Sequence, residues 1–194
     1  RIGKLKEEIA VPDTADSYAF ILWSRACAAR LYGDADTAGD EARHALLVDP
    51  EFVEARRLHA AMLVEGGRLK EARIHFQELL KRRKNDLRGL IGLGRLEIAE
   101  RDAPAAVAAL TKAVSVNSRI ADVRYWLGMA HAKNGDAERA ATALIAARNL
   151  DPRHAAAREQ LGRLRAEAGN YDAAAAEYSA VAAMQPERLD IAYA

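Results

Sequence analysis

Small side chains recur along the chain at a spacing of 34 residues, with larger apolar side chains between them. One small position is alanine or glycine, and a second position, twelve residues further on, is always alanine. The two sets are Ala26, Ala60, Gly94, Gly128 and Gly162, and Ala38, Ala72, Ala106, Ala140 and Ala174. Helices approach each other to about 8–10 Å only where the facing side chains are small. The pattern therefore predicts two packed helices in every period.

Turn-forming residues lie at fixed places between these small positions. Glycine accepts a left-handed backbone and ends the first helix of a pair, and Asp or Asn can then cap the second helix. The glycines are Gly33, Gly67, Gly135 and Gly169, with Arg101 at the equivalent place of the middle repeat. The capping residues are Asp34, Asp102, Asp136 and Asn170. The sequence therefore predicts ten repeat helices in five units, which span residues 19–52, 53–86, 87–120, 121–154 and 155–188.

The segments that flank these units do not complete a repeat. Ile2, Leu5 and Ile9 fall on one side of a helix, so residues 1–18 are predicted to form a helix and a linker over 13–17 that cap the first repeat. The alternative is that this segment is the tail of a preceding domain. Leu189 restarts the period, so residues 189–194 are predicted to begin a sixth repeat or to form a capping helix.

The repeats resemble those of the tetratricopeptide repeat family, in which each unit is an antiparallel helix pair. The resemblance rests on the invariant small alanine, on three Leu-Gly pairs and on the prolines that close the repeats. These are Leu93-Gly94, Leu127-Gly128 and Leu161-Gly162, and Pro50, Pro152 and Pro186. The resemblance implies an all-α fold, a right-handed superhelical α-solenoid. Arg25 and His59 stand where the family usually has leucine, so the first repeat is expected to be packed less tightly or to be partly covered by the N-terminal segment.

In this family the first helices line a concave groove, where peptides usually lie. Counted in the same register, the second, fifth, ninth and twelfth places of each unit face this groove. The candidate partner-binding residues are Phe20, Trp23, Cys27, Arg57, Arg88, Ile91, Arg95, Tyr125 and Met129. Aromatic residues, Met and Arg are enriched at the cores of protein interfaces. The alternative is that the arginines are solvated and the aromatic residues pack under the N-terminal helix.

Charge and composition narrow the function classes. The 29 basic and 28 acidic residues give a net charge of +1, which makes no electrostatic case for binding nucleic acid. No apolar run approaches the roughly 18 residues that span a bilayer. The single cysteine, Cys27, excludes an intrachain disulfide framework.

The sequence holds no pattern typical of a catalytic or metal centre. The five histidines do not pair at helical spacing, and none adjoins Cys27. Gly92 and Gly94 lie inside a predicted helix, which argues against a phosphate-binding loop. The basic run over residues 81–84 closes a helix, where cations stabilise the C-terminal end. We therefore expect no catalytic residue, no cofactor and no metal.

These observations favour a non-catalytic scaffold that holds a partner protein during assembly of a multiprotein complex. The alanine- and arginine-rich composition favours a bacterial source, in the cytoplasm or periplasm, with any membrane association provided by segments outside this chain. The resemblance implies a role in a bacterial envelope, secretion, pilus or exopolysaccharide system. One alternative is a regulatory or substrate-docking arm of an enzyme whose catalytic domain lies outside residues 1–194. Another is homo-oligomerisation through the terminal repeats.

Overall fold

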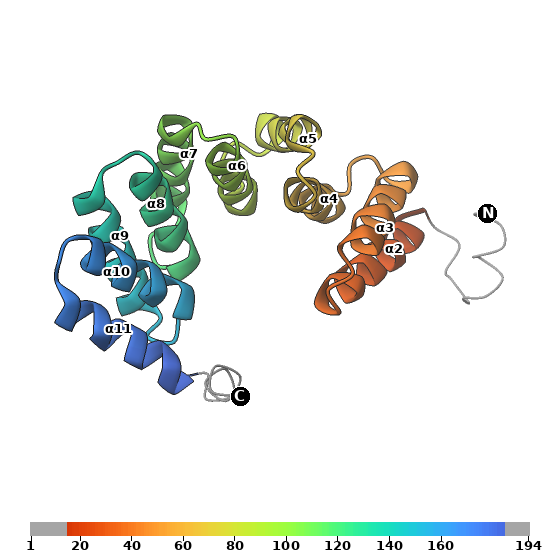
Figure 1. Cartoon of the computed structure of the whole chain (residues 1–194). Coiled ribbons are helices and arrows are strands. Elements are labelled where there is room, and N and C mark those ends of the chain that lie inside the picture. The colour runs from red at the N-terminus through yellow and green to blue at the C-terminus, as the bar shows by residue number, and fades with distance from the viewer. Residues whose placement is uncertain (1–14, 185–194) are drawn as a thin grey trace. The chain divides into compact units, whose positions relative to one another are not determined.

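The computed structural model describes residues 15–184, and this range is helical throughout, without a strand (Figure 1). Its ten helices are α2 (Ala15–Leu31), α3 (Ala35–Val48), α4 (Val53–Glu65), α5 (Leu69–Arg82), α6 (Leu87–Ala99), α7 (Ala103–Val116), α8 (Ala121–Lys133), α9 (Ala137–Leu150), α10 (Ala155–Glu167) and α11 (Tyr171–Met184). The predicted all-α helical-repeat fold is confirmed.

The chain divides into two compact units, each of which contains more than one repeat. The first unit ends at Gly92 and the second begins at Leu93, so the division falls inside α6. From here on, "unit" means one of these two parts, and a helix pair is called a repeat. In the first unit α2 packs against α3, α3 against α4, and α4 against α5. In the second unit the same order of packing runs from α7 through α8, α9 and α10 to α11. Within each unit these helices therefore pack on their neighbours in sequence, as expected for repeats that stack.

Four glycines and one arginine make the turns inside the helix pairs. Gly33, Gly67, Gly135 and Gly169 have φ values of 80°, 73°, 78° and 77°, and Arg101 takes the same left-handed conformation with φ of 64°. The carboxylates of Asp34, Asp102 and Asp136 each accept a backbone N–H of the next helix at 3.0 Å. The predicted turn chemistry is therefore present, and Arg101 fills the place where glycine is missing.

The helices of a pair approach closely because a glycine faces a bulky side chain. A methyl group built on Gly94 would lie 2.4 Å from Leu110 Cγ, and one built on Gly128 would lie 2.7 Å from Leu144 Cγ. The first pair has Ala26 and Ala42 at these two places, both fully buried. The same two positions therefore meet in each of these helix pairs, but the pairs fill the space between the helices with different combinations of small and large side chains.

Gly92, which lies inside α6 as predicted, has a packing role between helices. A methyl group at this position would lie 2.3 Å from the ring of Phe76, a fully buried side chain of α5. The two glycines near the centre of α6 are therefore explained by the side chains that lie over them.

The first helix begins earlier than predicted. The sequence predicts a linker over residues 13–17, but α2 starts at Ala15, so that prediction is wrong from this residue onward. Asp16 favours the helix N-terminus by its charge, and Tyr18 and Leu22 are buried against α3 and α4. Packing of these apolar side chains favours continuing the helix back to Ala15. The predicted cap over the preceding residues and the predicted sixth repeat lie outside the described range.

Arg25 and His59, which replace the usual leucine, each have a partner on the second helix of their pair. Arg25 Nη2 lies 2.7 Å from Glu41 Oε1. The His59 ring contacts the His75 ring with centroids 4.9 Å apart, and its Nδ1 lies 3.1 Å from the Gly39 carbonyl oxygen. Arg25–Glu41 and His59–His75 are thus polar pairs. The equivalent positions of the repeat formed by α8 and α9 hold Leu127 and Ala143, which belong to one apolar cluster.

The His59–His75 pair should make the first unit sensitive to acid. Burial lowers the pKa of both rings, that of His75 to about 4. The unfolded chain therefore binds more protons than the folded chain between about pH 6.5 and pH 4, and stability falls as the pH drops through this window. We expect a loss of about 1–2 kcal/mol, after a discount for the partial exposure of His75.

Urea unfolding near neutral pH and near pH 5 would measure this loss. The double variant His59→Leu, His75→Ala recreates the apolar pair of the second unit and should remove most of the difference. His44→Ala, which changes an exposed histidine of α3, should leave it unchanged. An undiminished pH dependence in the double variant would contradict the assignment.

Candidate functional site

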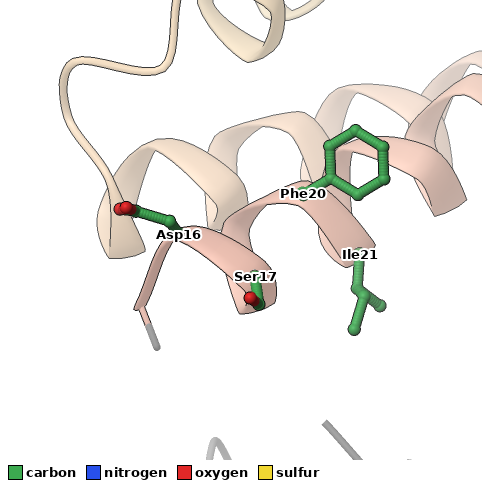
Figure 2. A pocket seen from close by; sticks show the side chains of 4 residues that line it. All are labelled: Asp16, Ser17, Phe20 and Ile21. Carbon is green, nitrogen blue, oxygen red and sulfur yellow. The ribbon is translucent and has the colours of Figure 1, made fainter. Parts of the chain in front are cut away.

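Aromatic side chains gather on the first-helix side of the N-terminal pair. The ring centroids of Phe20 and Trp23 are 5.3 Å apart, and those of Trp23 and Phe52 are 5.7 Å apart. Phe20 is 54% exposed, whereas Trp23 is half-buried against the core of the pair. Figure 2 shows a shallow hollow beside this group, lined by Asp16, Ser17, Phe20 and Ile21 of α2. This surface combines an anchored indole with an accessible phenyl ring.

Arg57 is committed to contacts within the protein. Its Nε donates to Asp86 Oδ1 at 3.0 Å, its Nη2 also donates to Asp86, and its Nη1 lies 3.4 Å from Glu54 Oε1. Asp86 in turn accepts the backbone N–H of Gly89 at 2.7 Å, at the start of α6. A bidentate arginine–carboxylate pair that also caps a helix is a structural contact. The structure therefore leaves Arg57 little capacity for a partner's carboxylate.

The thiol of Cys27 is influenced by the charges of two other arginines of the first unit. The thiol is partly buried, and this burial raises its pKa, while the positive charges of Arg30 and Arg88 act in the opposite direction. Arg30 follows Cys27 by one helical turn, and Arg88 lies near the start of α6. The charges of residues on two different helices therefore oppose the effect of burial on this thiol.

The second unit carries an aromatic group that we call the Tyr125 cluster, formed by Arg95, Tyr125, Trp126 and His154. Arg95 Cζ lies 4.9 Å from the centroid of the Trp126 ring, a cation–π contact. Tyr125 contacts Trp126 with ring centroids 4.9 Å apart and His154 with centroids 5.0 Å apart. Burial raises the pKa of the Tyr125 hydroxyl, and the nearby Glu159 carboxylate adds to this effect.

His154 is a capping residue, and its geometry argues against a role as a catalytic base. Its Nδ1 accepts the backbone N–H of Ala157 at 3.1 Å, which places the ring proton on Nε2. That nitrogen lies 3.1 Å from Asp122 Oδ1 and donates to it. Both ring nitrogens are therefore occupied within the protein, so this Asp–His pair has no free nitrogen to take a substrate proton.

In three repeats the fifth residue contacts the residue that precedes the next first helix, 29 positions later. The pairs are Trp23–Phe52, Arg57–Asp86 and Tyr125–His154. The chemistry differs from repeat to repeat, but the position of the contact is the same. One side of each fifth-place side chain therefore faces the neighbouring helix start, and only the remaining surface is available to a partner.

The second unit contains a buried charge cluster that the sequence pattern does not predict. The carboxylate of Glu177 on α11 is 3% exposed and accepts from three arginines of α9 and α10. The distances are 2.5 Å from Arg148 Nη1, 2.7 Å from Arg158 Nη1 and 2.9 Å from Arg165 Nη1. Burial alone would raise the pKa of Glu177, but the hydrogen bonds and charges of the arginines outweigh it and lower the pKa. The cluster joins three successive helices.

The remaining predicted residues lie on the first helices of both units. Ile91 and Met129 are half-buried, and Arg88 is exposed. Partner binding by the nine candidate residues stays a prediction. Within residues 15–184 no three His, Cys, Asp or Glu side chains are grouped so that they could hold a metal ion, and no helix has the length and apolar character needed to cross a membrane.

Comparison with known proteins identifies the family. The tetratricopeptide repeat family model matches residues 91–147 and 131–188. A comparison with curated protein sequences finds no significant match. The chain belongs to the tetratricopeptide repeat family, and its helix pairs are repeats of an α-solenoid.

Solved structures share this fold at low sequence identity. TTC0263, a tetratricopeptide repeat protein of Thermus thermophilus, has a TM-score of 0.83 and 22% identity over 90% of this chain and 95% of its own. PilF of Pseudomonas aeruginosa has a TM-score of 0.76 and 17% identity over 88% of this chain and 78% of its own. YrrB, described as having an unusual peptide-binding site, has a TM-score of 0.61 and 22% identity over 96% of this chain and 93% of its own.

The family defines the general class of function. Tetratricopeptide repeat proteins are scaffolds for protein–protein interaction, and this chain has the fold of that class. The partner and the cellular system are not defined by a shared fold. That the chain lacks catalytic activity likewise stays a prediction.

Proposed function

We propose that this chain is a scaffold that holds a segment of a partner protein along the first helices of its repeats. The observation that carries the proposal is the set of aromatic, Met and Arg side chains that remain partly accessible there. Trp23 and Tyr125 are each anchored on one side by the next helix start and are only half-buried. Pre-positioned aromatic side chains lose little conformational entropy on binding, which suits them as anchors for a partner.

We further propose that the partner belongs to a bacterial envelope, secretion, pilus or exopolysaccharide assembly. The composition supports a bacterial source, and two of the structurally similar proteins come from Thermus thermophilus and Pseudomonas aeruginosa. Under this proposal the chain contributes binding and positioning, and other components of the complex contribute any chemistry.

Site-specific photo-crosslinking in cells of the native host would test the binding face. A photoreactive residue at Met129, on the first helix α8, should crosslink to a partner several-fold more than one at Thr142, an exposed position on the second helix α9. Once the partner is identified by mass spectrometry, Tyr125→Ala should weaken its binding by about 2 kcal/mol, or roughly thirtyfold.

Circular dichroism of each variant would separate lost binding from lost folding. Equal crosslinking from positions 129 and 142, with helicity retained in both variants, would show that the first-helix face is not the binding surface. Crosslinks confined to position 142 would move the site to the second helices.

A further inference from the structure

The buried cluster around Glu177 contains more positive than negative charge. Three arginines share this one carboxylate, so the four side chains carry a formal excess of two positive charges. Arg57 of the first unit, by contrast, pairs with two carboxylates, those of Asp86 and Glu54. Among residues 15–184 the Glu177 cluster is therefore short of negative charge.

The other hydrogen bonds of the three arginines do not offset this excess. Within the described range each arginine makes one further hydrogen bond, and every acceptor is a neutral oxygen atom. Arg148 Nη2 donates to Asn149 Oδ1 at 3.3 Å, Arg158 Nε to the Pro152 carbonyl oxygen at 2.9 Å, and Arg165 Nη1 to the Ala173 carbonyl oxygen at 3.3 Å. Because a guanidinium group has five N–H groups, each arginine retains donors for another acceptor.

Three further carboxylates on or beside these helices are engaged elsewhere. Glu167 of α10 lies 3.8 Å from Arg163, and Asp151 accepts the backbone N–H of Arg153 at 2.9 Å in the turn before α10. Asp172 lies in the first turn of α11, where the positive end of its own helix stabilises a carboxylate. In the part of the chain that the structure describes, none of the three forms an ion pair with the cluster.

The cluster lies where α10 meets the two second helices that precede and follow it. Arg148 is in the last turn of α9 and Glu177 is in α11, and α10, which carries Arg158 and Arg165, packs on both helices (Figure 1). Between 17% and 26% of each arginine side chain is exposed. The three cations are therefore held in place by a buried carboxylate without being sealed from solvent.

A doubly charged oxyanion matches this excess of charge. A phosphate monoester carries about −1.5 to −2 charges at neutral pH and has three acceptor oxygen atoms. The planar guanidinium group pairs with phosphate through two parallel hydrogen bonds. A single carboxylate would neutralise only half of the excess, whereas a dianion would also relieve more of the repulsion among the three like charges.

We propose that Arg148, Arg158 and Arg165 bind a phosphate group, which belongs either to a small molecule or to a phosphorylated side chain of a partner protein. Glu177 positions the three guanidinium groups, and the phosphate oxygens accept from the N–H groups that Glu177 leaves free. Arg158 and Arg165 are at the fourth and eleventh places of their repeat, which are not among the places predicted to face the partner groove. The site therefore goes beyond the proposed scaffold function and does not depend on it.

Isothermal titration calorimetry of the full chain with inorganic phosphate and with acetate, at neutral pH and constant ionic strength, would test the proposal. Phosphate should bind to one site per chain and at least about tenfold more tightly than acetate. In urea unfolding, phosphate at about ten times its Kd should raise the equilibrium constant for folding about elevenfold, because it binds the folded chain.

Two further ligands would distinguish the sources of the phosphate group. A peptide with one phosphoserine that binds at least about tenfold more tightly than O-phosphoserine itself would assign the site to a phosphorylated partner protein. Equal affinities of the peptide and the amino acid would assign it to a small molecule. Both results support the phosphate site.

Arg148→Gln should weaken phosphate binding by about tenfold or more, while Glu177 keeps two arginine partners. The matched control Arg139→Gln removes an exposed arginine of the same helix and should change the affinity less than about twofold. Circular dichroism should show the same helicity for both variants. If Arg148→Gln loses helicity, Arg148→Lys, which keeps the charge but not the planar group, should still weaken binding about threefold or more.

Three results would overturn the proposal. They are a lack of saturable binding by phosphate and O-phosphoserine, equal affinities for phosphate and acetate, or an equal loss of affinity in the Arg148 and Arg139 variants. Partner crosslinks from position 129 that persist alongside any of these results would show that the scaffold function stands while this inference fails.

Discussion

Replacement of Glu177 by alanine should destabilise the C-terminal unit by about 3–5 kcal/mol, the range found when one partner of a buried ion pair is removed. The variant leaves three guanidinium groups close together without the carboxylate that they share. Because the cluster joins α9, α10 and α11, the loss should appear as early opening of α11. Urea unfolding would give the free-energy change, and hydrogen exchange would locate it.

Glu167→Ala provides the matched control for this prediction. Glu167 is an exposed carboxylate of α10 whose contact with Arg163 is 3.8 Å long, so its removal should cost less than about 1 kcal/mol. The pKa of Glu177 is lowered in the folded state, so its contribution is present above the ordinary carboxylate range and is lost as the pH falls through the folded pKa. Equal effects of the two substitutions would refute the structural role of the cluster.

A double-mutant cycle at Gly94 and Leu110 should show strong coupling. Leu110→Ala should cost about 2–5 kcal/mol because it removes a fully buried side chain. Gly94→Ala should cost about 1–2 kcal/mol, since overpacking against Leu110 exceeds the gain of up to about 1 kcal/mol in helix propensity.

In the double variant the added methyl group no longer meets Leu110. Gly94→Ala should then be neutral or stabilising, which gives a coupling of at least about 1 kcal/mol. The resulting Ala–Ala pair has the composition of Ala26 and Ala42 in the first pair of helices. Denaturant midpoints of the four proteins would measure the cycle, and additive costs would show that the two side chains do not compete for space.

The repeat pattern was sufficient to predict the fold because it reports on local geometry. The alanine at the second small position is at most 3% exposed in all five helix pairs, as expected where two helices meet. The start of α2 was misplaced because Asp16 and Ser17 are typical of a linker, whereas packing of Tyr18 and Leu22 decides the outcome. Tertiary contacts of this kind leave little trace in local sequence.

The candidate site was harder to predict because residue type does not show whether a charge is already paired. Arg57 and Arg88 belong to the same predicted stripe, yet the first is bound to Asp86 and the second is exposed. The three arginines around Glu177 lie between 12 and 29 positions away from it in the sequence. Such contacts depend on the packing of successive helices, which periodicity alone does not describe.

The contacts between the fifth residue and the residue before the next first helix bear on how repeats can be exchanged. Both members of each pair belong to the same 34-residue repeat, counted from the start of one first helix to the residue before the next first helix. Recombination at the boundary between two repeats would therefore transfer both members together. The Glu177 cluster has the opposite property, because Arg148 belongs to the preceding repeat. Moving the repeat of α8 and α9 elsewhere would separate the two charges. The order of the repeats of α8–α9 and α10–α11 is therefore constrained by electrostatics.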